Sequence, residues 1–439
     1  MNAFAVVTPA AVAAYYTALS GDCMGNFVLE RYPALKFARY RRYWLASFAS
    51  VGATQLITLG QGWLIFELSG SALQLGILGA AAAIPNIAMT LIGGVVADRF
   101  DKRIILMCTS GTITLLLGVL AWLDYAELVR VWHVLSIAAA FSMITGLDWP
   151  VRVSIYPQLV DRSAFMSAVA LNSFIWQATR MAIPAIGGIV IAMSDTWVVF
   201  ALGAAGFLVM LLVVSGIHVK VSELADASPL EQMAEGVRFI WHEDLFKWLI
   251  LLTFVGMFFA NSYVQIMPVF ADLLGSGETG FGYLLSAGGV GSVVGTLMMG
   301  GVHKYARLGL VMLGGAALSV ATLMIFAWCV ASGWFYAALL MTFLTSVFAA
   351  VFMISSMTVL QLSVPDQLRG RVMGIHTMGY SLMPLGGLFL GVLAEAAGAA
   401  QAVLIGSSIF LLGILGVGMA AASIRGLDGT NIGLQESGA

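Results

Sequence analysis

Long stretches without a formal charge alternate along the chain with short charged segments. A helix needs roughly 20 apolar residues to cross a bilayer, so each long stretch predicts a transmembrane helix. The run 308–365 is long enough for two helices, and Ser332-Gly333-Trp334 is the predicted turn between them. Another run ends at Thr179 and resumes at Met181, interrupted by Arg180 alone. The remaining runs are 44–66, 68–97, 104–123, 131–147, 196–219, 248–271, 279–303, 372–394 and 396–424. Together they predict twelve helices.

The segment GGVVADRFDKR at 93–103 concentrates charge between two of these runs. Because both flanking runs are long enough to cross a membrane, the charged segment is predicted to be a tight turn in water at the membrane face.

The composition supports a membrane protein. Of the 439 residues, 60% are hydrophobic and only 10% are charged, which is unusual for a soluble protein of this length. The predicted fold class is therefore an all-α polytopic membrane protein. A net charge of −2, without a basic patch, argues against a nucleic-acid partner. Cys23, Cys108 and Cys329 lie far apart, so neither a metal site nor a disulfide framework is predicted.

The positions of the basic residues predict the orientation. When the loops are assigned alternately to the two sides, 18 of the 20 Lys and Arg residues fall on the side that holds both termini. Only Arg130 falls on the other side, and Arg180 lies within a span. Positive residues are retained in cytoplasmic loops, so both termini are predicted to be cytoplasmic in a multi-pass plasma (inner) membrane protein.

The chain divides into two six-helix halves. Residues 1–43 form a predicted cytoplasmic segment, 44–217 the first half, 218–246 a linker, 247–424 the second half and 425–439 a cytoplasmic tail. The first 20 residues are apolar, but they lack the basic start of a signal peptide and Pro9 interrupts them. They are therefore not expected to add a helix, and Met24 is a candidate start.

Weak internal similarity accompanies this division. GGVVADR at 93–99 has a counterpart in GGVHKYAR at 300–307, and IPAIGG at 183–188 is echoed by MPLGG at 383–387. Parallel repeats of this kind build six-plus-six transporters, in which the binding site lies where the halves meet. The linker itself places Leu230, Met233, Val237, Ile240 and Trp241 at helical spacing, which predicts an amphipathic helix on the inner membrane surface.

The motifs resemble the major facilitator superfamily. GGVVADRFDKRIIL is similar to its signature G-x-x-x-D-R-x-G-R-R/K, although Asp101 replaces the usual glycine. The matching residues are Gly94, Asp98, Arg99, Lys102 and Arg103. FARYRRYWLASFAS at 37–50, FELSGSALQLG at 66–76, DWPVRVSIYPQLVDRSAFMSAVALNS at 148–173 and LRGRVMG at 368–374 resemble the branch of macrolide-efflux and enterobactin-export proteins. The resemblance covers residues 37–424 and implies proton-driven export by alternating access.

The same resemblance implies a conformational latch at the charged turn. Asp98 is expected to face the N-terminus of helix 11, which is predicted to begin near Gly370 beside helix 2, where an anion is stabilised by the helix dipole. Arg99 or Arg103 is then expected to pair with Asp148 at the inner end of helix 4. The alternative is that these charges only determine topology.

Helix 5 partly matches an exporter motif, G-x-x-x-G-P-x-x-G-G. The chain keeps Pro184, Gly187 and Gly188, with Thr179 and Ile183 at the two earlier glycine positions. Proline kinks a helix and glycine permits close helix approach, so a hinge at the interface between the halves is predicted. Ordinary packing of small residues is the alternative.

Arg180 is the most unusual single residue. It lies roughly 24 Å into helix 5, counted from a start near Ala164 at 1.5 Å per residue. A cation in a bilayer costs at least about 2.5 kcal/mol, and so needs water, a counter-charge or an anionic ligand. The candidates are an outer-end acid such as Glu67 and an anionic group of the substrate.

The remaining candidates concern the cavity and the coupling ion. The resemblance places helices 1, 4, 7 and 10 around the pathway, and Gln55, Trp63, Asn261 and Gln265 are candidates there for contact with a bulky, mostly apolar ligand. No acid lies at the middle of a predicted span, so His376 and Asp148 are the candidate coupling groups. Proton coupling is implied by the resemblance alone, and sodium coupling and uniport are alternatives.

Export of a drug-like or siderophore-like molecule is the favoured function. Uptake of a metabolite by the same fold and a non-transport role as a membrane enzyme or assembly factor are the alternatives. The chain has no H-E-x-x-H and no G-x-x-x-x-G-K-[ST], and its G-x-G-x-x-G at 275–280 follows no predicted strand. The expected partners are a small-molecule substrate, membrane lipid and a proton. A monomer with no enzyme activity, cofactor or metal is predicted.

Overall fold

The computed structural model describes residues 31–217, 229–302 and 307–427. The side chains of 91–99, 229–234, 301–302 and 422–423, and those of Pro157 and Asp366, are outside this description.

Six long helices form the first half of the molecule. They are α3 (Ala38–Ser69), α4 (Ala72–Arg99), α5 (Lys102–Tyr125), α6 (Val131–Leu159), α7 (Phe165–Met193) and α8 (Thr196–Ser215), with the short 3-10 helices η1 (Pro33–Lys36) and η2 (Arg162–Ala164). Of the six, α3 has the most polar composition, since three arginines lie in its first turns and glutamines lie along it. The other five each contain a stretch long and apolar enough to cross a membrane.

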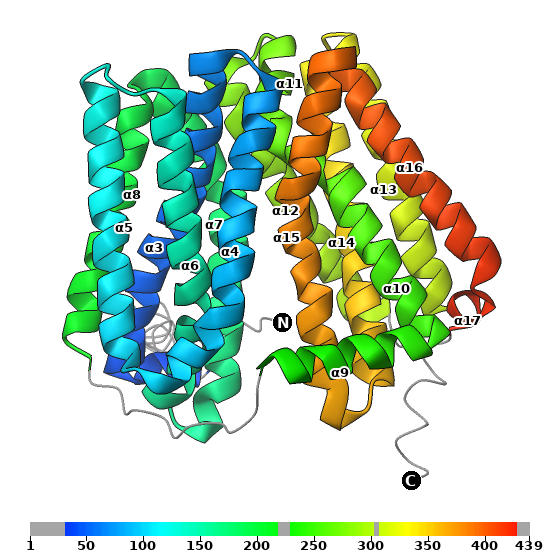
Figure 1. The fold of residues 1–439 in the computed structure, drawn as a ribbon, viewed down its shortest axis with the longest axis horizontal. Coiled ribbons are helices and arrows are strands. Elements are labelled where there is room, and N and C mark those ends of the chain that lie inside the picture. The colour runs from blue at the N-terminus through cyan, green and yellow to red at the C-terminus, as the bar shows by residue number, and fades with distance from the viewer. Residues whose placement is uncertain (1–30, 218–228, 303–306, 428–439) are drawn as a thin grey trace, which may run out of the picture.

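The second half begins with a helix that changes its hydrogen-bond pattern along its length. This helix runs through α10 (Asp244–Val255), a π segment η3 (Gly256–Ala260), a 3-10 segment η4 (Asn261–Ile266) and α11 (Met267–Leu273). It is followed by α12 (Gly277–Val302), α13 (Leu308–Ala331), α14 (Phe335–Ser363), α15 (Asp366–Ala397), α16 (Ala399–Ala420) and the short α17 (Ala422–Arg425). Over the residues that the structure describes, the fold is therefore all-α with twelve long helices in two groups, as the sequence predicts (Figure 1).

Tight turns separate neighbouring helices where the charge-free runs predict them. Gly333, between α13 and α14, has φ +71°, a left-handed conformation that glycine adopts without steric cost. The run 308–365 therefore does contain two helices, joined at Ser332-Gly333-Trp334. At the charged turn, Asp101 caps α5 by accepting a hydrogen bond from the Arg103 backbone N–H at 2.8 Å. An acid at this position is favourable because it satisfies a free N–H at the helix start.

The linker helix α9 (Pro229–His242) lies across one end of the second half, which is named the linker end below (Figure 1). The amphipathic helix predicted there is present, and it packs against α15: Gly236 lies against Arg371 and Ile375, and Arg371 pairs with Glu235 at 2.5 Å. Ile240 is buried, whereas Val237 and Trp241 are exposed. The apolar positions therefore serve two faces, one toward the protein and one toward the surroundings. Leu230 and Met233 lie outside the described side chains.

The halves contact each other through two glycine-rich helix crossings away from the linker end. In one, Gly79 of α4 lies against Pro384 of α15; in the other, Gly282 of α12 lies against Pro184 of α7. Methyl groups added at these glycines would come 2.8 Å and 2.5 Å from the respective proline carbonyl oxygens. Helix α4, the predicted helix 2, therefore lies beside α15, the predicted helix 11, as expected. Only glycine permits so close an approach.

Two hydrogen bonds join the halves in the same region. Ser71 Oγ donates to Glu395 at 3.1 Å, and the Ala185 backbone N–H donates to Ser286 Oγ at 2.8 Å. Trp63 of α3 stacks on Phe281 of α12 with ring centroids 6.0 Å apart. The described halves are thus closed against each other at the end opposite α9.

Candidate functional site

A buried ion pair lies inside α6. Asp148 and Arg152 are one helical turn apart, their side chains form a salt bridge, and the two residues are only 4% and 7% exposed. Positions i and i+4 lie on the same helix face, so the pair forms within one element. It lies within the segment Val131–Tyr156, which is long and apolar enough to span a membrane.

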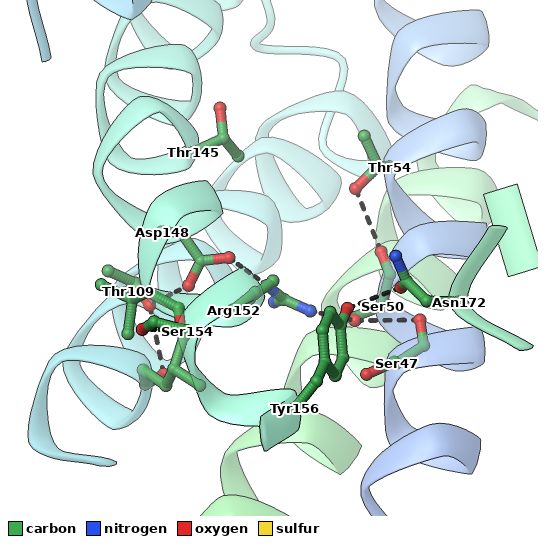
Figure 2. Close-up of polar contacts among 12 residues, drawn as sticks. Ser47, Ser50, Thr54, Thr109, Thr145, Asp148, Arg152, Ser154, Tyr156 and Asn172 are labelled. Carbon is green, nitrogen blue, oxygen red and sulfur yellow. Dashed lines mark hydrogen bonds and ion pairs between the residues drawn. The ribbon is translucent and has the colours of Figure 1, made fainter. Parts of the chain in front are cut away.

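The pair connects three helices of the first half, as Figure 2 shows. Thr109 of α5 donates a hydrogen bond from Oγ1 to Asp148 Oδ1 at 2.6 Å. On the other side, Arg152 Nη1 donates to Ser50 Oγ of α3 at 2.9 Å. One turn further along α6, the Tyr156 hydroxyl donates to Asn172 Oδ1 of α7 at 2.5 Å. A change in the charge of Asp148 would therefore alter the contacts that hold α3, α5 and α6 together.

This geometry corrects two predictions. Helix 4 was expected to end at Asp148, with Arg152 in the following loop, but α6 continues to Leu159, because the two charges compensate each other inside the helix. Asp148 was also expected to pair with Arg103 or with Arg99, whose side chain lies outside the described residues. In the structure Asp148 pairs with Arg152, and the Arg103 guanidinium donates instead to the Ser215 carbonyl of α8. The signal that was missed is the spacing D-x-x-x-R.

The rest of the predicted latch is only partly described. The side chains of Asp98 and Arg99, and the surroundings of Gly94, lie outside the described residues. Lys102 is buried at the start of α5. The latch therefore stays a prediction.

Arg180 lies on the face of α7 that meets the second half. Gly289 of α12 is packed against its backbone carbonyl, and its guanidinium interacts electrostatically with Tyr263 of η4 and Tyr380 of α15. Its side chain is exposed. Arg180 makes no salt bridge with any residue that the structure describes. The predicted partner Glu67 instead has other acids around it, Asp195, Asp124 and Glu278.

His376 is buried in the second half. Its Nε2 lies 3.1 Å from Ser356 Oγ, which lies 3.2 Å from Thr253 Oγ1, so the three side chains link α15, α14 and α10. Its Nδ1 has no hydrogen-bond partner among the described residues. No acid lies within this chain of contacts among the described residues.

The four predicted cavity residues lie on α3 and η4. Trp63 is buried in the contact between the halves, and Gln265 packs against Gly387 of α15. Asn261 donates from Nδ2 to the Gly256 carbonyl at 3.5 Å, across the π segment. Gln55 is half-buried on α3. Hence three of the four have protein neighbours that account for their burial.

The residues of the predicted helix 5 motif lie in α7, and they contact two different helices. Pro184 and Gly188 face Gly282 of the second half, whereas Gly187 lies against Leu56 and Leu59 of α3 in its own half. Pro184 is inside the helix, at the crossing itself. The hinge role stays a prediction. Within the described residues no cluster of three His, Cys, Asp or Glu could hold a metal.

Comparison with known proteins places these features in a family. A family model described as transmembrane secretion effector matches residues 31–430. The staphyloferrin A transporter of Staphylococcus aureus is 24% identical, over 77% of this chain and 85% of its own length. The multidrug efflux pump Tap of Mycolicibacterium fortuitum is 25% identical, over 81% and 89%. The enterobactin exporter of Shigella boydii is 26% identical, over 88% and 92%.

Solved structures show the same fold. A bacterial homologue of the human lysosomal transporter Spinster, in an inward-facing and unoccupied conformation, superposes with a TM-score of 0.67 at 15% identity, over 91% of this chain and 97% of that one. A nucleoside transporter superposes with a TM-score of 0.69 at 13% identity, over 87% and 98%. At these identities the likeness concerns the fold alone.

Proposed function

Because the chain belongs to the transmembrane secretion effector family of the major facilitator superfamily, we propose that it exports a bulky, largely apolar or siderophore-like small molecule in exchange for protons. The relatives named as siderophore and multidrug exporters match it over most of its length, which supports export over uptake. Both six-helix halves are in one chain, so a monomer without a cofactor is sufficient for the proposed transport.

The buried Asp148–Arg152 pair is the observation that supports proton coupling. A proton on Asp148 removes the counter-charge of a buried arginine, which is strongly unfavourable unless the helices rearrange or another anion approaches. Since the pair holds α3, α5 and α6 together through Ser50 and Thr109, loading and unloading a proton would be tied to a rearrangement of the first half.

The orientation belongs to the same proposal. We place the linker end and both termini in the cytoplasm, since the basic residues gather in those loops. Arg152 no longer counts among the basic residues of the cytoplasmic loops, because it lies within α6. The excess of basic residues on that side remains. The closed end, where Ser71 meets Glu395, then faces outward, and the structure corresponds to the state that is closed to the outside.

The test is accumulation of a lipophilic fluorescent dye, and separately of a secreted siderophore, in cells that express the chain or an empty vector. We expect the chain to lower accumulation, and a protonophore to abolish the difference. Higher accumulation than in the vector cells would instead indicate an uptake permease.

Coupling is tested with Asp148→Asn/Arg152→Gln, which removes both charges and keeps two polar side chains of similar size. We expect this variant to reach the membrane but to lose the response of transport to an imposed pH gradient. The control is Asp244→Asn/Lys247→Gln, which removes an exposed ion pair with a spacing of three residues. Full pH-driven transport by the buried double variant would exclude the pair as the coupling site.

A further inference from the structure

Arg180 carries a positive charge at the contact between the two halves, about midway along α7. Arg180 is 15 residues from the start of α7 and 13 from its end, so it lies roughly 20 Å from either end of the helix. Its backbone is packed against Gly289 of α12, and its guanidinium interacts with Tyr263 and Tyr380 from two other helices of the second half. Arg180 therefore lies at the contact between the halves, with its charge within electrostatic reach of the second half.

The described protein does not neutralise this charge. Tyrosine hydroxyls are neutral donors and acceptors, and they cannot replace a carboxylate. Asp148, the buried acid of the first half, is already paired with Arg152. Glu67 lies in the acidic surroundings of Asp195 and Asp124 at the far end. An uncompensated cation within a membrane span is by default a functional group.

The surroundings of Arg180 are suited to an organic ligand. Trp176 lies one turn away on the same face of α7 and meets Trp149 of α6 edge to face, with ring centroids 5.3 Å apart. Trp149 is 44% exposed and Tyr380 is 53% exposed, although both lie well inside long helices. Exposed aromatic side chains on the helices around a guanidinium fit a molecule that joins an acidic group to an apolar or aromatic body.

We propose that Arg180 binds an acidic group of the transported molecule, and that the substrates of this chain are organic anions in which a carboxylate is attached to an apolar or aromatic body. This inference rests on the proposed transport function and specifies its substrate class. Arginine can hold a carboxylate through two parallel hydrogen bonds, a geometry that lysine cannot reproduce.

Binding to the purified full-length chain in lipid nanodiscs tests this directly, by isothermal titration calorimetry with 1-naphthoate and its neutral isostere 1-naphthamide. We expect the wild type to bind the anion at least about 10-fold more tightly than the amide, and Arg180→Gln to abolish that difference. Arg180→Lys should retain part of it. Arg238→Gln, which changes an exposed arginine on α9, should match the wild type. The elution profile and melting temperature of each variant establish that it is folded.

Three results would overturn the inference: equal affinity of the wild type for the two probes, unchanged discrimination in Arg180→Gln, and no binding of 1-naphthoate by the wild type. Dye accumulation in cells separates this inference from the proposed function. Export of a neutral dye by both wild type and Arg180→Gln, with no anion preference, would refute the inference and leave export standing. Selective anion binding without export would support the inference and refute export.

Discussion

Gly282 lies so close to Pro184 that a single methyl group on the glycine would come 2.5 Å from the proline carbonyl oxygen. At the corresponding crossing of α4 and α15, a methyl group on Gly79 would come 2.8 Å from the Pro384 carbonyl oxygen. Helices α4 and α12, each the second long helix of its half, thus supply the glycines, and α7 and α15, each the fifth, supply the prolines. Equivalent helices of the two repeats form equivalent contacts, and these contacts close one end of the transporter.

A large side chain at this crossing should prevent closure. We expect Gly282→Leu to shift the population toward the state that is open to the outside, because the Pro184 backbone cannot yield to a side chain without separation of the halves. The measurement is disulfide formation between cysteines placed at Ser71 and Glu395, which touch across the closed end. The yield should fall several-fold. Gly118→Leu, at a glycine of α5 with open space around it, is the control and should leave the yield unchanged.

The buried ion pair should show strong coupling in stability measurements. We expect Asp148→Asn alone to destabilise the protein by about 3–5 kcal/mol, because it leaves Arg152 buried without a counter-charge. Adding Arg152→Gln should recover much of this loss. Thermal or denaturant unfolding of the two single variants and the double variant provides the coupling energy. Additive effects would contradict the structural role assigned to the pair.

His376 should behave as a structural residue. We expect His376→Leu to lower stability by about 1–3 kcal/mol, since Ser356 loses its contact with the ring inside the protein. His376→Gln can restore a hydrogen bond to Ser356 and should keep both stability and proton-driven export close to those of the wild type. If His376→Gln folds normally but no longer responds to a pH gradient, His376 carries protons after all.

Asp98→Asn tests the predicted latch. We expect this variant to reach the membrane at the wild-type level and to export at least about 10-fold more slowly, because an uncharged side chain is stabilised less at a helix N-terminus. Initial rates of dye export, normalised to the amount of protein in the membrane, are the measurement. Asp101→Asn is the control: asparagine also caps a helix, so α5 should retain its start. Unchanged export by Asp98→Asn would exclude the latch.

The charge-free runs predict the helices well because a bilayer imposes a length and a composition on every span. The same criterion fails at α6, where two opposite charges one turn apart satisfy each other and the helix continues to Leu159. It also treats all apolar positions of α9 alike. Ile240 packs inward while Val237 and Trp241 stay exposed, since the packing of α9 against α15 and α10 decides which face is covered.

The amino-acid pattern by itself determined the helices, their grouping into two halves and the linker helix, because hydrophobicity and helical spacing are local properties of the chain. Only the tertiary structure decided which charges meet. Asp148 pairs with Arg152, and Arg103 donates to a carbonyl of α8. Arg180 interacts electrostatically with two tyrosines of the other half, and makes no described salt bridge with Glu67. Such pairings depend on helix rotation and depth, which are determined by the packing of side chains that are distant in the chain.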